Sequence, residues 1–119
     1  MVSQSPVVLI VFDGCRPDGL AQAHTPHADS LWQNGAYTWT AKSVVPSITL
    51  PTHNTMFRAV GPEKHCVTDN IFHSAASAYP SILDVAHGAR RRTAMFYSWG
   101  ELRDLCAPES LDLSLLRAP

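Results

Sequence analysis

One run of six apolar residues, from Val7 to Phe12, constrains the fold of this chain more than any other feature. β-branched side chains dominate the run, and Asp13-Gly14 closes it. This pattern is typical of a strand that is buried on both faces of a parallel sheet. The run is too short to cross a bilayer, and no Lys or Arg precedes it as in a signal peptide. We therefore expect a buried strand at 7–12, no membrane segment and a cytoplasmic protein.

Helix start and stop signals delimit the next segment. Thr25-Pro26 and Asn34-Gly35 bound a short helix, in which Thr25 is expected to cap the first turn and Pro26 suits the first position. The residues that follow, 36–45, contain Tyr, Trp, Thr and Val, and they predict extended structure.

Two more helices are predicted further along the chain. One is expected from near Thr49 to about Arg58, because Pro51 is tolerated only in a first turn. The other follows residues 81–84, which resemble a capping box, and it stops at Gly88.

The second half of the chain extends this alternation of helices and strands. Residues 93–97 predict a strand, whereas no element is predicted in the tail from 111 to 119. Strand, helix and strand in this order favour an α/β fold with a mostly parallel sheet flanked by helices. No repeat or linker interrupts the 119 residues, so we expect all of them to belong to one domain.

Composition narrows the class of protein. Hydrophobic residues make up 45% of the chain and charged residues 16%, which is typical of a globular domain. The formal net charge of -1 leaves no basic excess that would attract duplex nucleic acid or anionic lipid. Three irregularly spaced cysteines, Cys15, Cys66 and Cys106, indicate neither a disulfide framework nor a Cys-x-x-Cys metal site.

Two residues stand where a catalytic site could form. Asp13 directly follows the expected strand, at the edge where α/β sheets bind ligands, and its carboxylate suits a divalent cation. The competing interpretation is a simple turn aspartate before Gly14. Thr49 begins a predicted helix, where backbone N–H groups and the helix dipole could hold a phosphoryl group against its hydroxyl. Its competing interpretation is an N-cap threonine.

Four separate motifs support a metal-binding role for Asp13 and a nucleophilic role for Thr49. They are Val-Phe-Asp-Gly-Cys-Arg-Pro-Asp at 11–18, Thr-Pro-His-Ala-Asp-Ser-Leu at 25–31, Pro-Ser-Ile-Thr-Leu-Pro-Thr-His at 46–53 and Pro-Glu-Lys-His-Cys-Val-Thr-Asp-Asn at 62–70. In order and spacing this series resembles the nucleotide pyrophosphatase/phosphodiesterase branch of the alkaline phosphatase superfamily. The resemblance extends over about residues 7 to 105.

The resemblance implies a fold, a reaction and three residue roles. The chain would be the N-terminal portion of an alkaline phosphatase-like catalytic domain. Asp13 would bind one of two zinc ions, Thr49 would ligate the same ion and attack phosphorus, and Asn70 would hydrogen-bond a phosphoryl oxygen. The reaction would hydrolyse a phosphodiester or nucleotide substrate through a phosphothreonine intermediate. Phosphonoacetate hydrolase-like and phosphomonoesterase specificities are alternatives on the same machinery.

The chain departs from the family pattern in two respects. Ala59 and Cys66 replace glycines that are usual in the family, which matters wherever the backbone needs a positive φ. The family's other zinc ligands lie beyond the point that corresponds to Pro119. Because a zinc site needs at least three protein ligands, we expect these 119 residues alone to bind zinc weakly and to turn over little substrate. A truncated or binding-only product without catalytic activity is the alternative from another functional class.

Several other polar residues have simple structural interpretations. His53 is expected to be a packed or backbone-bonded histidine rather than a general base. The basic segment 90–92 predicts a solvated turn rather than a nucleic-acid site. Arg16 and Asp18 either orient substrate or form a surface salt bridge.

Overall fold

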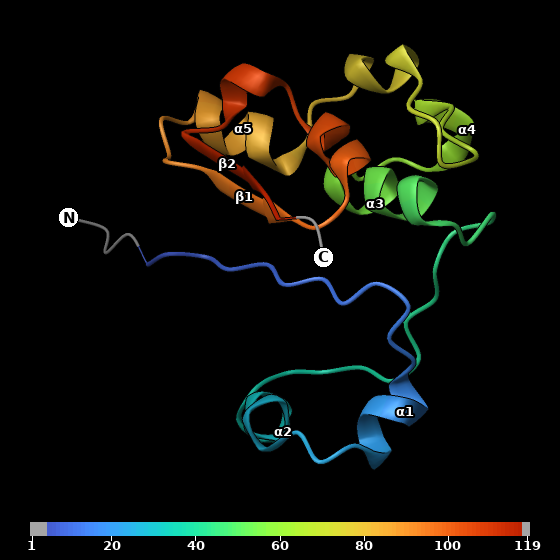
Figure 1. The fold of residues 1–119 in the computed structure, drawn as a ribbon, viewed down its shortest axis with the longest axis vertical. Helices are drawn as coiled ribbons and strands as arrows, with labels where there is room; N and C mark the ends of the chain where they lie inside the picture. Colours follow the sequence, from blue (N-terminus) through green and yellow to red (C-terminus); the bar gives the residue numbers. More distant parts are fainter. Residues whose placement is uncertain (1–4, 118–119) are drawn as a thin grey trace. The chain divides into compact units, whose positions relative to one another are not determined.

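The computed structural model describes residues 5–117, which form two compact units. The first unit ends at Ala41 and the second begins at Lys42 (Figure 1). The expectation of one catalytic domain concerns the complete family fold and stays a prediction.

Two short helices form the regular structure of the first unit. They are α1 (Pro17–Gln22) and α2 (Pro26–Asn34). The bounds of α2 confirm the predicted helix, and Pro26 takes its first position. Thr25 is the N-cap, but its hydroxyl donates to Asp29 Oδ1 at 2.9 Å instead of capping a backbone N–H. The sequence did not predict α1, because six residues are too few for a helical periodicity to show.

The apolar run at 7–12 is not a strand, so the expectation of a buried strand there is wrong. The run has no regular secondary structure, and its side chains are exposed, from 39% for Val11 to 92% for Val7. A strand needs a neighbour for its backbone hydrogen bonds. In the described part of the chain, the sheet consists of β1 (Ala94–Tyr97) and β2 (Leu113–Leu116). The run therefore keeps strand-like composition without the partner that a strand requires.

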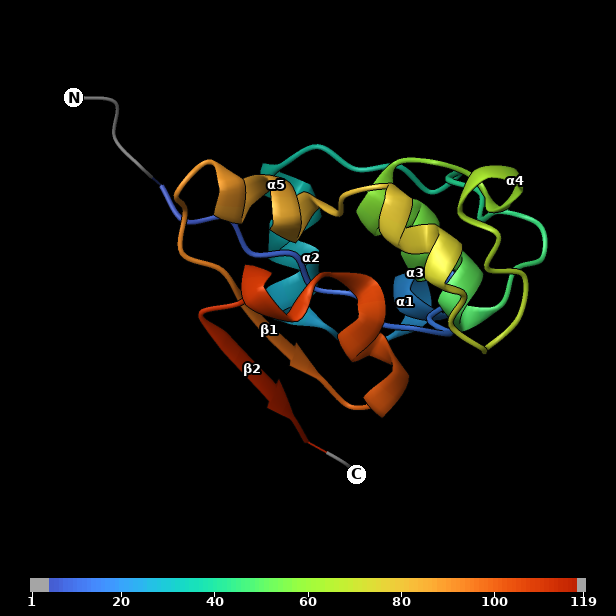
Figure 2. The ribbon, with the colours of Figure 1, turned by 90° about the horizontal axis from the view of Figure 1, so that it is seen from above.

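The second unit packs helices beside this small parallel sheet (Figures 1 and 2). Its α-helices are α3 (Thr49–Arg58), α4 (Pro62–His65) and α5 (Ile82–Gly88). Its 3-10 helices are η1 (Ser74–Ala78), η2 (Gly100–Leu105) and η3 (Pro108–Ser110). Residues 36–45, for which extended structure was predicted, contain no helix and no strand.

The helix predictions for this unit are confirmed by local hydrogen bonds. α3 has the predicted bounds, with Pro51 in its first turn. The capping box before α5 is complete: the Ser81 N–H donates to Asp84 Oδ2 at 2.6 Å, and the Asp84 N–H donates to Ser81 Oγ at 3.2 Å. Both contacts join residues three positions apart, so sequence spacing was sufficient to predict them.

The sheet confirms an α/β fold with parallel strands, but it includes a strand that the sequence did not predict. Strand β2 lies in the tail, parallel to β1, with Ala94 opposite Leu113 and Tyr97 opposite Leu116 (Figure 2). At its start the Thr93 N–H donates to Asp112 Oδ2 at 2.7 Å, and the Asp112 N–H donates to the Thr93 carbonyl at 3.0 Å. Parallel pairing depends on a long connection, here η2 and η3, which a local pattern cannot reveal.

Two apolar clusters form the core of the second unit. One contains Leu50, Val67 and Ala76, with Phe72, Trp99 and Leu102 packed against it. The other contains Met95, Leu105 and Cys106, with Phe57, Leu83, Tyr97, Leu102 and Leu111 packed against it. Helix α3 contributes Leu50 to the first cluster and Phe57 to the second. Leu50 is fully buried, which stabilises the fold by about 1.5–3 kcal/mol, and Phe57 is partly buried. Because α3 contributes to both clusters, it is the central element of this unit.

Candidate functional site

The N-terminus of α3 places Thr49 where the sequence suggested a reactive hydroxyl. Ile48 takes the N-cap position with extended backbone, φ -111° and ψ 159°, and Thr49 is the first helical residue. The interpretation of Thr49 as a side-chain N-cap is therefore wrong. The first helical hydrogen bond runs from the Thr52 N–H to the Ile48 carbonyl at 3.1 Å. The first turn of a helix leaves its N–H groups without helical partners. Because Pro51 has no N–H, these groups belong here to the residues before Pro51.

Asn70 lies at the same helix terminus. Its Oδ1 atom accepts a hydrogen bond from the Leu50 N–H at 3.1 Å, across 20 positions of sequence. The bond satisfies one of the N–H groups that the first turn of a helix leaves open. It also assigns the carboxamide orientation, because the oxygen faces the backbone and Nδ2 carries the two N–H donors. Thr49 and Asn70, predicted separately from two motifs, thus both adjoin Leu50.

His53 behaves as the sequence indicated. It is buried, and its Nδ1 lies 2.8 Å from the Thr49 carbonyl oxygen one turn earlier. Because a carbonyl only accepts, Nδ1 carries the proton and donates. The prediction of a backbone-bonded histidine is confirmed, and the ring helps to order the first turn of α3.

Asp13 occupies a tight turn in the first unit. The Cys15 N–H donates to the Phe12 carbonyl at 3.3 Å, and Gly14 has φ +73°. A positive φ favours glycine, since a side chain there is strained. Asp13 itself is exposed. The turn interpretation of Asp13 is therefore confirmed as local structure, and a turn aspartate with an exposed carboxylate is compatible with metal binding.

Asp13 and Thr49 belong to different units, so their convergence on one cation stays a prediction. Between residues 5 and 117, no group of three or more His, Cys, Asp or Glu side chains is placed to hold a metal ion. Zinc sites require at least three protein ligands. Zinc binding by Asp13 and Thr49 therefore stays a prediction.

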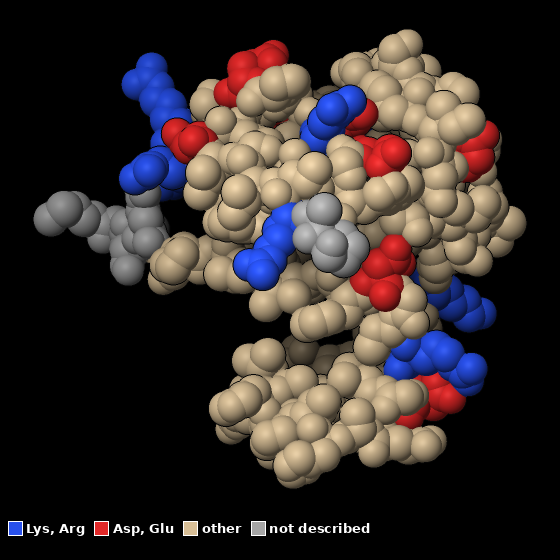
Figure 3. All heavy atoms as spheres, viewed as in Figure 1, with Lys and Arg blue, Asp and Glu red and all other residues tan. Residues whose placement is uncertain are grey.

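The other charged side chains that the sequence analysis considered lie on the surface. Arg16 Nη2 lies 2.7 Å from Asp18 Oδ2, and both side chains are exposed, so the pair is a surface salt bridge. Residues 90–92 are exposed after α5, as expected for a solvated turn. On the face drawn in Figure 3, basic and acidic side chains are interspersed on a largely uncharged surface. No helix among residues 5–117 is long and apolar enough to span a membrane.

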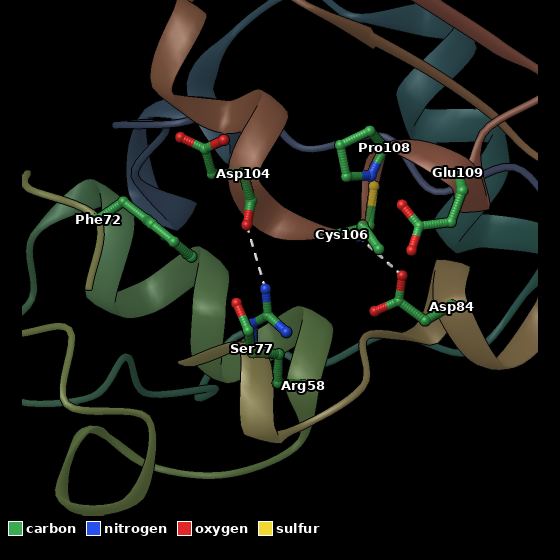
Figure 4. Close-up of a pocket in the computed structure, with 9 residues that line it drawn as sticks. Arg58, Phe72, Ser77, Asp84, Asp104, Cys106, Pro108 and Glu109 are labelled. Carbon is green, nitrogen blue, oxygen red and sulfur yellow. Dashed lines mark hydrogen bonds between the residues drawn. The ribbon is translucent and has the colours of Figure 1, made fainter. Parts of the chain in front are cut away.

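A small cavity lies at the other end of α3 (Figure 4). Its volume is about 250 Å³, and its lining includes Arg58, Asp84, Asp104 and Cys106. The guanidinium of Arg58 donates through Nη2 to the Asp104 carbonyl at 3.1 Å, and Asp84 Oδ1 accepts from the Ala107 N–H at 2.9 Å. The polar groups of the cavity thus connect structural elements of the second unit.

Cys106 does not supply a nucleophile to this cavity. The thiol is buried, and burial raises its pKa to about 11. A thiol with that pKa is protonated at neutral pH, and only the thiolate is strongly nucleophilic. Cys106 is therefore not a thiolate nucleophile at neutral pH, and the candidate site that carries the motif residues is the start of α3.

Comparison with known proteins defines the class to which this site belongs. The family model for type I phosphodiesterase / nucleotide pyrophosphatase matches residues 7–92. This chain belongs to that family. It is 37% identical over 71 residues to an uncharacterized pyrophosphatase/phosphodiesterase of Schizosaccharomyces pombe (strain 972), an alignment that covers 60% of this chain. The chain spans about 15% of the length of that relative. No solved structure matches the chain significantly.

Sequence reasoning missed two buried residues that organise the surroundings of the site. Arg58 was predicted only as the end of a helix, and His65 was quoted within a motif without a role. Their relative exposures are 7% and 0%. Their charged or titratable type is the local signal that both residues carry, but several of their partners lie ten or more positions away in sequence, where spacing does not reveal them.

Proposed function

We propose that this chain is the part of a phosphodiesterase or nucleotide pyrophosphatase that carries the nucleophile, Thr49. The observation on which the proposal depends is the hydrogen bond between the Leu50 N–H and Asn70 Oδ1, which adjoins Thr49 at a helix N-terminus. It brings Asn70 to the residue that follows Thr49, and the family pattern links Thr49 and Asn70 to phosphoryl transfer. Family membership supports the same reaction class.

The start of α3 suits an anionic group for a simple electrostatic reason. The aligned peptide dipoles of this helix place partial positive charge at its N-terminus, where phosphate groups are commonly bound. Thr49 is the first helical residue and half-buried. A phosphoryl group bound there would have the threonine hydroxyl as its nearest nucleophile in this segment.

The proposed reaction is a double displacement at phosphorus. Thr49 Oγ1 forms a bond to phosphorus as the leaving-group oxygen departs with its electron pair, and the hydroxyl proton is released to solvent. Water then attacks the phosphothreonine, which restores the threonine hydroxyl and releases the phosphomonoester. Asn70 Nδ2 would donate to a non-bridging oxygen, whose negative charge increases as the bonds change.

Two zinc ions are the proposed cofactors of the complete enzyme, and Asp13 and Thr49 are the oxygen donors that this chain would contribute. Besides these two oxygen donors, the chain would supply the nucleophile through Thr49 and a phosphoryl contact through Asn70. We propose an alkaline phosphatase-like fold for the complete domain, with a small phosphodiester or nucleotide as substrate. Phosphonoacetate hydrolase-like or phosphomonoesterase specificity would use the same threonine.

The proposal is tested by binding and turnover together. Inorganic phosphate, titrated into the ¹⁵N-labelled chain, should shift the backbone resonances of Thr49 and Leu50 and the side-chain amide of Asn70. With zinc present, any hydrolysis of bis(p-nitrophenyl) phosphate above the rate of zinc alone should disappear in Thr49→Ala and persist in Thr49→Ser. Thr52→Ala is the matched control, because its hydroxyl is one turn away and contacts Ser43 Oγ at 2.9 Å.

Two results would count against the assignment. One is turnover that survives Thr49→Ala, which would remove the threonine from the chemistry. The other is a set of phosphate-induced shifts that avoids the start of α3. Two observations together would identify a binding-only product rather than an enzyme. The chain would bind phosphate without turnover, and the codons beyond Pro119 would encode no further Asp and His ligands.

A further inference from the structure

His65 is the most completely buried titratable side chain near the candidate site. It is the last residue of α4 and has a relative exposure of 0%. Both ring nitrogens have partners: Nδ1 accepts from the Val67 N–H at 3.0 Å, and Nε2 lies 3.0 Å from Thr55 Oγ1. A buried imidazole with two satisfied nitrogens holds one orientation, because rotation would break both bonds.

The partners determine where the proton of this ring lies. A backbone N–H only donates, so Nδ1 must be the unprotonated nitrogen. The neutral ring then carries its proton on Nε2 and donates it to Thr55 Oγ1. Protonation of Nδ1 would bring two N–H groups face to face and break the bond to Val67.

These bonds fix a short segment to α3 at two points. Thr55 lies in the middle of α3, and Val67 is fully buried in the same apolar cluster as Leu50. Three residues beyond Val67, the side chain of Asn70 accepts the hydrogen bond from Leu50. The segment 65–70 is therefore fixed to α3 by His65 at one end and by Asn70 at the other.

We propose that His65 is a positioning residue, which holds the segment 65–70 so that Asn70 lies at the N-terminus of α3. The relevance of this positioning to catalysis rests on the function proposed above, in which Asn70 contacts the phosphoryl group. The geometric claim is independent of that function. His65 does not touch substrate in this role and acts only through the segment that it orients.

Burial and the charge of Arg58 together favour the neutral form of His65. Burial lowers the pKa of His65, and Arg58 on α3 lowers this pKa further, whereas Glu63 on α4 acts in the opposite direction. At neutral pH the ring is therefore uncharged and able to accept the Val67 N–H. The positioning contact should be lost in acid, when Nδ1 becomes protonated.

Amide hydrogen exchange of the ligand-free chain tests the proposal without any need for activity. The Leu50 N–H is protected by Asn70, so Asn70→Ala should abolish its protection and serves as the reference. His65→Phe keeps a buried ring but removes both hydrogen bonds, and it should lower the Leu50 protection factor by at least about tenfold. Thr93→Val is the matched control, because it removes a buried hydrogen bond to the Ser110 carbonyl in the distant strand region.

A second variant separates positioning from a general loss of stability. In His65→Asn, the shorter amide oxygen can accept the Val67 N–H in a local turn, but the side chain does not titrate. In the wild type, the Leu50 amide resonance should shift together with the His65 ring, at a midpoint below the ordinary pKa of 6.5. In His65→Asn this titration should disappear.

Three results would overturn the role of His65. They are equal Leu50 protection in His65→Phe and Thr93→Val, full Leu50 protection in Asn70→Ala, and a Leu50 titration that survives in His65→Asn. If His65→Phe does not fold, the role of His65 is tested by comparing the Leu50 titration in the wild type with that in His65→Asn. Failure of the phosphate titration described earlier would remove the proposed function but would leave these exchange results unchanged.

Discussion

Arg58 Nε donates a hydrogen bond to Asn54 Oδ1 at 3.0 Å, one helical turn earlier on α3. Asn54 is itself completely buried, and its Nδ2 donates to the Leu50 carbonyl at 3.0 Å. Arg58 also donates to the Tyr79 and Asp104 carbonyls, which lie in two other segments of the unit. A buried polar network of this kind links the two ends of α3 and joins it to the connections around the sheet.

Arg58→Met should destabilise the chain by about 3 kcal/mol, because one buried and two partly buried acceptors lose their donor while the apolar stem is kept. The free energy of unfolding in urea measures the effect. Arg103→Met is the control, since the Arg103 side chain is 71% exposed and should change stability by no more than about 0.5 kcal/mol. Equal effects of the two substitutions would show that the Arg58 network contributes nothing to stability.

Two of the described helices end on a residue with left-handed backbone that glycine would adopt more easily. Ala59 ends α3 with φ 55°, and Cys66 ends α4 with φ 61°. We predict that Ala59→Gly and Cys66→Gly each stabilise the chain by about 0.5–1 kcal/mol in thermal or urea unfolding. Ala86→Gly, inside α5, should destabilise by a similar amount. A destabilising effect of the first two substitutions would contradict the left-handed conformation.

The carboxylate of Asp84 should make stability sensitive to acid. Burial acts to raise the pKa of Asp84, but hydrogen bonds from the Ser81 N–H, Ser110 and the Ala107 N–H hold this pKa below its ordinary value of 3.8. A lowered pKa stabilises the fold above about pH 4, and this stabilisation is lost as the pH falls through the folded-state pKa.

Asp84→Asn tests that contribution, because an amide has one acceptor oxygen where the carboxylate has two. Its cost at pH 7 should be about 1–3 kcal/mol, and the difference from wild type should shrink below pH 4. Urea unfolding at several pH values measures both effects. Asp18→Asn, in an exposed ion pair, is the comparison variant and should change stability by less than about 1 kcal/mol. A cost for Asp84→Asn that is the same at pH 3 and pH 7 would contradict the assignment.

The exposed run at 7–12 should limit the solubility of the chain. Contiguous apolar side chains on a surface promote association, and charge interrupts such a run. Val8→Lys with Ile10→Lys should raise the concentration at which the chain stays monomeric in light scattering. Ala21→Lys with Gln22→Lys adds the same charge on α1 without changing the run. If both double variants gain equally, net charge rather than the apolar run limits solubility.

The sequence predicted elements whose signals lie close together in the chain. The bounds of α2 and α3 followed from prolines and stop signals, and the capping box of α5 followed from a three-residue spacing. Thr49 and Asn70 were identified by motif, although their common neighbour Leu50 was not. Strand β2 was missed and a strand was expected at 7–12, because strand formation depends on a partner that local composition does not specify. Helix α1 was missed because it is too short to show a helical periodicity.

Residue type and spacing alone determined the family, the parallel α/β character and the start of α3, since these depend on contacts within a few residues or on an ordered series of motifs. Only the tertiary structure decided that Asn70 bonds Leu50, that His65 joins two segments and that Arg58 is buried. Each of these depends on chain segments that meet across ten or more positions. Contacts of this kind are determined by the packing of the whole unit, because a buried polar group forms its hydrogen bond with whichever segment packs next to it.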